Sequence, residues 1–111
     1  MQIRRQISKM YSVIITTTNS KKSAKEIANT LLKKRLAACV QIDKIKSSYI
    51  WQEKLQEDRE FRLTIKTKSK LYKRVKKAIS KIHPYEVPEI IELNIKNISK
   101  EYAKWIDETV I

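Results

Sequence analysis

The sequence contains no glycine, and this absence is the first constraint on its chemistry. Loops that cradle phosphate groups in nucleotide-binding proteins need glycines, because only glycine lets the backbone approach the phosphate closely. Such a loop is therefore excluded. The chain also has a single cysteine, Cys39, which rules out an internal disulfide and a cysteine-rich zinc site.

Long apolar runs are also missing. No segment approaches the roughly 18 apolar residues of a membrane-spanning helix, and residues 1–10 hold no hydrophobic stretch typical of a secretory signal. We therefore expect a cytoplasmic protein that makes no membrane contact. Residues 1–9 show no clear period, and we expect a disordered tail or an upstream-start extension there. A single domain is expected over residues 10–111.

Acidic residues are few compared with basic ones. The 111 residues hold 25 Lys and Arg against 12 Asp and Glu, for a formal charge of +13. Such a chain can bind nucleic acid through its phosphates. However, 19 of the 25 cations are lysines, scattered over most of the expected elements instead of forming one arginine-rich patch, and lysine- and isoleucine-rich sequences without glycine are typical of AT-rich coding bias. We therefore expect no nucleic-acid partner.

What is present is a regular alternation of hydrophobic patterns. Period-two or β-branched runs predict strands at 11–17, 36–51, 60–67 and 87–95, with a polar hairpin connection at 52–59. Helical periods predict helices at 24–35, 70–82 and after Ser99. We expect Ser23 and Ser69 to cap the first two helices. This order predicts an α+β fold, a ferredoxin-like split βαβ sandwich with an added C-terminal helix.

Such a sandwich has helices on one face of its sheet only. Apolar residues of the long strands, among them Ile14, Tyr49 and Trp51, are expected on the uncovered face. Because an exposed apolar sheet face favours association, we expect a homo-oligomer.

The stretch from Ile82 to Ile91 contains the only histidine and both prolines. The prolines end the second helix by about Ile82, because each disfavours helical geometry in the residue before it. His83 is a candidate metal ligand, a candidate acid or base, or a hydrogen-bonding residue at a helix end. A lone histidine needs further ligands, either from other copies of the chain or from Cys39, which would form a thiolate–imidazole pair suited to copper. Cys39 also fits a small buried hydrophobe.

Other candidate site residues surround this stretch. Glu60 and Lys66 lie on the polar face of one expected strand. They could form a salt bridge with each other, or they could belong to a ligand site in which Lys66 binds an anion. Trp51 and Tyr85 suit interface packing or an aromatic pocket for a small molecule. Glu86 and Glu89 are strand-edge charges or ligands for a hard cation. No residue pattern supports covalent or acid–base catalysis, and we expect the protein not to be an enzyme.

Several stretches together resemble one family. Arg35–Ile42 (RLAACVQI), Ser48–Trp51, Glu60–Thr67, His83–Ile90 (HPYEVPEI) and Tyr102–Trp105 are similar to the CutA divalent-cation tolerance proteins, in the family's order and spacing. The resemblance implies a ferredoxin-like homotrimer joined by strands across subunits and a role in tolerance to divalent metals such as copper. It places a metal or small-molecule site in the cleft between subunits, formed from Cys39, Trp51, Glu60, Lys66, His83, Tyr85 and Glu89.

The chain departs from the family at important positions. Copper ligands proposed for some members are a cysteine ending the first strand and a His-His pair, which here read Thr16 and Ile82-His83. Only His83 remains of that set. The glycine usual in the hairpin corresponds to Glu53. The resemblance therefore leaves a second hypothesis open, a signalling trimer of the PII type that binds a small anionic effector through Lys66.

Overall fold

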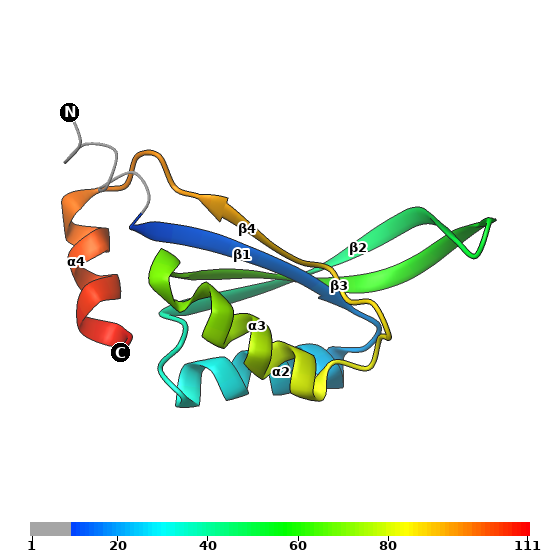
Figure 1. Cartoon of the computed structure of the whole chain (residues 1–111), viewed down its shortest axis with the longest axis horizontal. Coiled ribbons are helices and arrows are strands. Elements are labelled where there is room, and N and C mark those ends of the chain that lie inside the picture. Colours follow the sequence, from blue (N-terminus) through cyan, green and yellow to red (C-terminus); the bar gives the residue numbers. More distant parts are fainter. Residues whose placement is uncertain (1–9) are drawn as a thin grey trace.

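The computed structural model describes residues 10–111, which form one antiparallel sheet with three helices (Figure 1). The sheet order is β2–β3–β1–β4. The elements are β1 (Tyr11–Thr18), α2 (Lys21–Lys33), β2 (Cys39–Trp51), β3 (Lys54–Lys68), the 3-10 turn η1 (Ser69–Leu71), α3 (Tyr72–Ile82), β4 (Ile90–Asn94) and α4 (Lys100–Thr109). This is the predicted ferredoxin-like α+β fold with its C-terminal helix. The tail expected at residues 1–9 lies outside the described residues.

The core lies between the sheet and the two helices that cover one of its faces (Figure 1). Ile14 of β1 and Leu63 and Ile65 of β3 are fully buried there. The apolar stripes of α2 and α3 complete it, with Ile27, Leu31, Val75 and Ile79 fully buried. Burial of each such side chain contributes about 1.5–3 kcal/mol, so this interface holds the layers together.

The opposite sheet face is only partly covered. Successive strand residues point to opposite faces, so Val13 and Ile15 of β1 point away from the helices and are half-buried. Ile91 and Leu93 of β4, paired with them, are 45% and 53% exposed. The expectation that Ile14 lies on this open face is wrong, because Ile14 has the opposite parity and packs beneath the helices. The part of the open face formed by β1 and β4 is apolar, as predicted, whereas β3 places Arg62 and Lys66 on the same face.

Helix α4 covers one end of the open face. The Tyr11 hydroxyl donates to the Asp107 carboxylate at 2.9 Å, and Lys68, opposite Tyr11 on β3, lies 3.7 Å from the same carboxylate. The helix begins after Ser99, whose hydroxyl accepts from the Tyr102 backbone N–H, as predicted. Ile106 is fully buried and anchors the helix.

The β2–β3 hairpin is longer than the sequence predicted. The two strands continue to Trp51 and Lys54, and only Gln52 and Glu53 connect them. Both residues have positive φ, 51° and 66°, as in a type I′ turn. The predicted connection at 52–59 is wrong, because its charged residues pair as a strand and the turn lacks the glycine that would mark it. The hairpin therefore projects beyond the helices (Figure 1).

Several predicted boundaries also shift. Helix α2 begins earlier than expected because Ser20 caps it, accepting from the Ser23 N–H at 3.1 Å, so the expected cap at Ser23 is wrong. Ser69 does not cap α3, which follows the turn η1, and its hydroxyl instead bonds that of Ser12. Strand β2 begins at Cys39, three residues later than predicted, although the preceding segment is buried. Strand β4 likewise begins only at Ile90.

Candidate functional site

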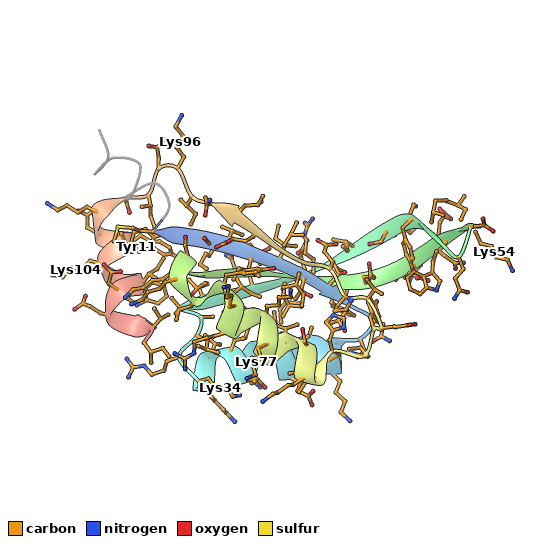
Figure 2. The ribbon with its side chains drawn as sticks, viewed as in Figure 1. Tyr11, Lys34, Lys54, Lys77, Lys96 and Lys104 are labelled. Atoms are coloured by element: carbon orange, nitrogen blue, oxygen red, sulfur yellow. The ribbon has the colours of Figure 1, made fainter. Side chains whose placement is uncertain are left out.

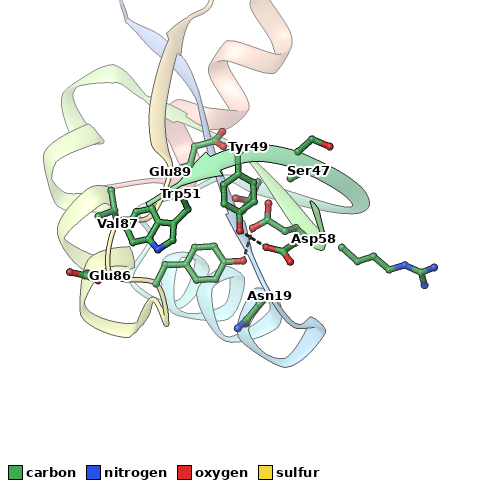
Figure 3. Close-up of a pocket in the computed structure, with 13 residues that line it drawn as sticks. Asn19, Ser47, Tyr49, Trp51, Asp58, Glu86, Val87 and Glu89 are labelled. Carbon is green, nitrogen blue, oxygen red and sulfur yellow. Dashed lines mark hydrogen bonds between the residues drawn. The ribbon is translucent and has the colours of Figure 1, made fainter. Parts of the chain in front are cut away.

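A pocket of about 870 Å³ lies where the hairpin meets the segment that follows α3 (Figure 3). Strands β2 and β3, the end of β1 and the segment between α3 and β4 all contribute to it. Its lining residues are Thr17, Asn19, Ser47, Ser48, Tyr49, Trp51, Asp58, Arg59, Glu60, Tyr85, Glu86, Val87 and Glu89.

Strand parity and register bring these side chains together. Ser47, Tyr49 and Trp51 alternate along β2 and therefore share one face, and Asp58 of β3 pairs directly with Ser47. The remaining wall comes from the chain after α3, where Pro84 disfavours helical geometry at His83 and the backbone becomes extended. The elongated hairpin is thus needed to form the pocket.

The centre of the pocket is a buried carboxylate. Glu60 is only 6% exposed, and its Oε2 atom accepts a hydrogen bond from the Tyr85 hydroxyl at 2.5 Å. Burial raises the pKa of Tyr85, and the hydrogen bond to Glu60 raises this pKa further. Tyr85 is consequently a hydrogen-bond donor at neutral pH.

A second tyrosine–carboxylate pair lies at the rim. The Tyr49 hydroxyl donates to Oδ2 of Asp58, and Figure 3 shows the two groups pointing toward one another. This hydrogen bond is the main cause that raises the pKa of Tyr49. Unlike the Glu60–Tyr85 pair, this pair is exposed to solvent.

The pocket is acidic and aromatic in a chain of strongly positive charge. Four carboxylates line it, those of Asp58, Glu60, Glu86 and Glu89, against one cation, Arg59. The rings of Tyr49, Trp51 and Tyr85 supply apolar surface between them. Such a lining suits a cation, because carboxylate oxygens are ligands for hard metal ions.

His83 lies beside the pocket and holds its wall in place. Its Nδ1 atom accepts from the Tyr85 backbone N–H at 3.1 Å, and its Nε2 atom donates to the Thr17 carbonyl oxygen at 2.8 Å. Its ring contacts the Tyr85 ring edge-on at 4.8 Å. Desolvation by burial lowers the pKa of His83, which favours this neutral form. Both ring nitrogens are therefore engaged, and metal binding would require one of these bonds to break.

Cys39 and Lys66 lie elsewhere on the sheet. They pair with each other across β2 and β3, at the level of Val13 on β1, and Lys66 donates to the Gln41 side chain. The His83 contact at Thr17 is four residues further along β1, about 13 Å at 3.3 Å per residue. One chain therefore cannot place His83 and Cys39 on the same metal ion.

The pocket unites five of the candidate site residues, Trp51, Glu60, Tyr85, Glu86 and Glu89. The suggested Glu60–Lys66 salt bridge does not form, because Glu60 bonds Tyr85 and Lys66 bonds Gln41. Sequence reasoning missed Asp58, which it assigned to a loop. The alternation that continues from Glu60 back through Asp58 was the available signal.

Two absences within the described part of the chain bear on function. Among residues 10–111, no three or more His, Cys, Asp or Glu side chains gather closely enough to hold a metal ion. None of the helices within that range combines the length and the apolar character needed to cross a membrane.

Fold and site together define a ferredoxin-like α+β protein with an acidic pocket beside an open sheet face, and known proteins of this kind match the chain. The sequence is 40% identical to the divalent-cation tolerance protein CutA of Archaeoglobus fulgidus over 101 residues, covering 91% of this chain and 99% of the relative. It is 35% identical to the protein of the same description from Pyrococcus horikoshii over 96 residues, covering 86% of this chain and 94% of the relative.

Solved structures agree with the sequence matches. That of the periplasmic divalent cation tolerance protein CutA from Archaeoglobus fulgidus superposes with a TM-score of 0.90 at 39% identity, covering 92% of this chain and all of that one. A CutA1 structure from the psychrotrophic bacterium Shewanella sp. SIB1 gives 0.89 at 32% identity, covering 93% and 97%. The sequence model of the CutA1 divalent ion tolerance proteins matches residues 12–109. The chain belongs to this family.

Proposed function

We propose that this CutA1 family member binds a divalent cation in the acidic pocket, within a homotrimer, and acts by binding rather than by catalysis. The observation that carries the proposal is that four carboxylates and one cation line a single pocket of a chain whose net charge is +13. A pocket of opposite sign to the rest of the molecule selects cations.

The donor set favours an oxygen-preferring cation over copper. Soft thiolate ligands suit Cu(I), whereas carboxylates suit harder ions. The two candidate copper ligands are far apart in one chain, and both nitrogens of His83 are engaged. A copper site built from His83 and Cys39 would therefore need side chains from different subunits.

A second copy of the chain would also complete a site for a hard cation. Within residues 10–111, one chain does not bring three metal-ligating side chains together. The open sheet face and the projecting hairpin offer surfaces for association, with Ile50 and Leu55 67% and 73% exposed. We propose that trimer formation covers these residues and brings further ligands to the pocket.

The hypothesis of an anionic effector is not favoured. Lys66, its proposed anchor, lies outside the pocket and bonds Gln41. The pocket carboxylates would repel an anion.

Binding without catalysis is supported by His83, whose two ring nitrogens are held by backbone groups and are not free to transfer a substrate proton. We also propose a cytoplasmic location, where the free thiol of Cys39 would remain reduced. Cell fractionation with an antibody against the protein tests this location, and recovery in a periplasmic fraction would refute it.

The test of cation binding is calorimetric titration of the purified protein with Mn(II), Zn(II), Cu(II) and, under anaerobic conditions, Cu(I), with light scattering on the same samples. We expect saturable binding of Mn(II) or Zn(II) at a fixed ratio to a trimer, and at least tenfold weaker binding in Glu86→Gln and Glu89→Gln. Glu108→Gln, an exposed carboxylate on α4, is the matched control and should bind normally.

Each alternative outcome has a clear meaning. Copper binding that is lost in His83→Ala and Cys39→Ser but kept in the glutamate variants would identify His83 and Cys39 as the metal ligands and refute a site in the acidic pocket. Non-saturable binding of every ion would refute a metal site, and a monomer by light scattering would refute the trimer.

A further inference from the structure

The positive charge of the chain is concentrated in its helical layer. We define the basic layer as residues 20–34 and 69–82, which comprise α2, η1 and α3 with their ends. It holds eleven of the 25 Lys and Arg residues and a single acid, Glu26. The remaining described residues hold eleven cations and eleven acids and are neutral. The lysines are spread along the sequence and form no arginine-rich patch, but the fold gathers the eleven cations of α2, η1 and α3 with their ends, ten of them lysines, on one layer.

A coding bias toward lysine does not explain this uneven distribution of charge. A general enrichment in lysine would raise the charge of every element, whereas the sheet, hairpin and α4 are balanced by carboxylates. All eleven cations of the layer are exposed. The two ion pairs among the described residues, Arg62 with Asp43 and Lys68 with Asp107, lie outside it. The charge of the layer is thus not neutralised by the protein.

The helices also form a continuous outer surface. Helices α2 and α3 pack against each other and bury their apolar faces on the sheet, so their charged faces point outward together. Figure 2 shows Lys34 and Lys77 on this layer at the bottom of the view, whereas Lys96 lies at the top and Lys104 on α4 at the left. At 1.5 Å per residue, the 13 residues of α2 span about 20 Å.

We propose that the basic layer binds the phosphate backbone of duplex nucleic acid without reading its sequence. This proposal goes beyond the cation site, because no residue of the basic layer lines the pocket. A 20 Å stretch of duplex DNA carries about 12 phosphate charges, one per 1.7 Å, comparable to the net charge of +10 on the layer. Ten of its eleven cations are lysines, which act as point charges rather than as bidentate readers of base edges.

A nucleic acid fits better than a lipid surface. Amphipathic helices that lie on membranes insert their apolar faces, but the apolar faces of α2 and α3 are used in the core. What remains is electrostatic attraction alone, which is strongest toward a polymer that releases condensed counterions.

The test is fluorescence anisotropy with a labelled 20-base-pair DNA duplex of mixed sequence, from 50 to 200 mM salt. We expect binding at 50 mM salt that weakens steeply as salt rises. Charge reversal on α2 (Lys21→Glu, Lys22→Glu, Lys25→Glu) should lower the affinity at least about tenfold and flatten the salt dependence, because about three phosphate contacts are lost. Reversal on α3 (Lys73→Glu, Arg74→Glu, Lys77→Glu) should act similarly and serves as an independent variant.

The matched control reverses Lys96, Lys100 and Lys104 to Glu, three exposed cations near or on α4, and changes the net charge by the same amount. It should lower the affinity less than about twofold. The α2 variant should remain folded, since carboxylates in the first turns of a helix interact favourably with its dipole. Circular dichroism checks this.

Three results would overturn the proposal. The first is no binding at 50 mM salt. The second is an equal loss in the α4 control, which would show a net-charge effect without a specific surface. The third is binding to vesicles of phosphatidylserine and phosphatidylcholine that persists at salt concentrations where duplex binding is absent, which would assign the layer to a lipid surface.

Discussion

Replacing Tyr85 with phenylalanine isolates the hydrogen bond at the centre of the pocket. The substitution keeps the ring and its edge-on contact with His83, and removes only the hydroxyl that donates to Glu60 at 2.5 Å. Glu60 is 6% exposed, so water cannot readily replace the lost donor. A hydrogen bond to a charged group contributes about 1.5–3 kcal/mol, and leaving a buried acceptor unpaired adds a desolvation cost.

Tyr85→Phe should lower the free energy of unfolding by about 1–2 kcal/mol. This is less than the sum of the hydrogen-bond and desolvation terms, because Tyr85 itself is only half-buried. For a domain of this size such a change lowers the Tm by about 5–10 °C. Thermal and urea unfolding at fixed protein concentration measure it, since association would otherwise alter the apparent stability.

Tyr49→Phe is the matched control. It removes the same hydroxyl from a tyrosine that also donates to a carboxylate, that of Asp58, but at an exposed position. Solvent replaces that bond, and we expect no measurable change in Tm. Equal effects of the two substitutions, or no effect of Tyr85→Phe, would refute the argument that burial of Glu60 gives the inner bond its importance.

Two further predictions concern the end of β1. Thr16 is fully buried, and its hydroxyl oxygen has no hydrogen-bond partner among the described residues; Thr16→Val should therefore raise the free energy of unfolding by about 1 kcal/mol. Thr18→Val, whose hydroxyl bonds that of Ser23 at 2.7 Å, should lower it by a similar amount, and the same sign for both would contradict the reasoning. His83, the only histidine, should titrate by NMR below its ordinary pKa of 6.5, because burial disfavours its charged form. The unfolded chain therefore binds a proton at His83 more readily than the folded chain does, so the contribution of neutral His83 to stability is complete above pH 6.5 and is lost as the pH falls through the lower folded pKa. His83→Gln should remove this pH dependence of stability. If the variant keeps the same pH dependence, groups other than His83 cause it.

The sequence by itself determined the order of the strands and helices and which face of each of them is buried. Strict alternation in 60–67 and helical spacing of Ile27, Leu31, Val75 and Ile79 are local properties, readable without knowledge of distant contacts. The motifs around Cys39 and His83 were sufficient to suggest the family, and the matches with known proteins confirmed it.

Only the tertiary structure decided how far the hairpin extends and what the pocket contains. Gln52 and Glu53 carry no turn signal, and their left-handed conformation is imposed by the pairing of Trp51 with Lys54. That pairing sets the register that places Asp58 beside Tyr49. Because register depends on contacts between strands, the local pattern did not identify Asp58 as a pocket residue.

The distances between candidate ligands and the grouping of charges were likewise set by the fold. From the sequence, both His83 and Cys39 are candidate metal ligands. In the structure they lie at different places on the sheet, and both ring nitrogens of His83 form hydrogen bonds with backbone groups. The cations of α2 and α3 are far apart in sequence and neighbours in space, because both helices must bury their apolar faces on the same side of the sheet. Hydrophobic periodicity determines which face of each element is buried, whereas the packing of those faces determines which polar groups meet.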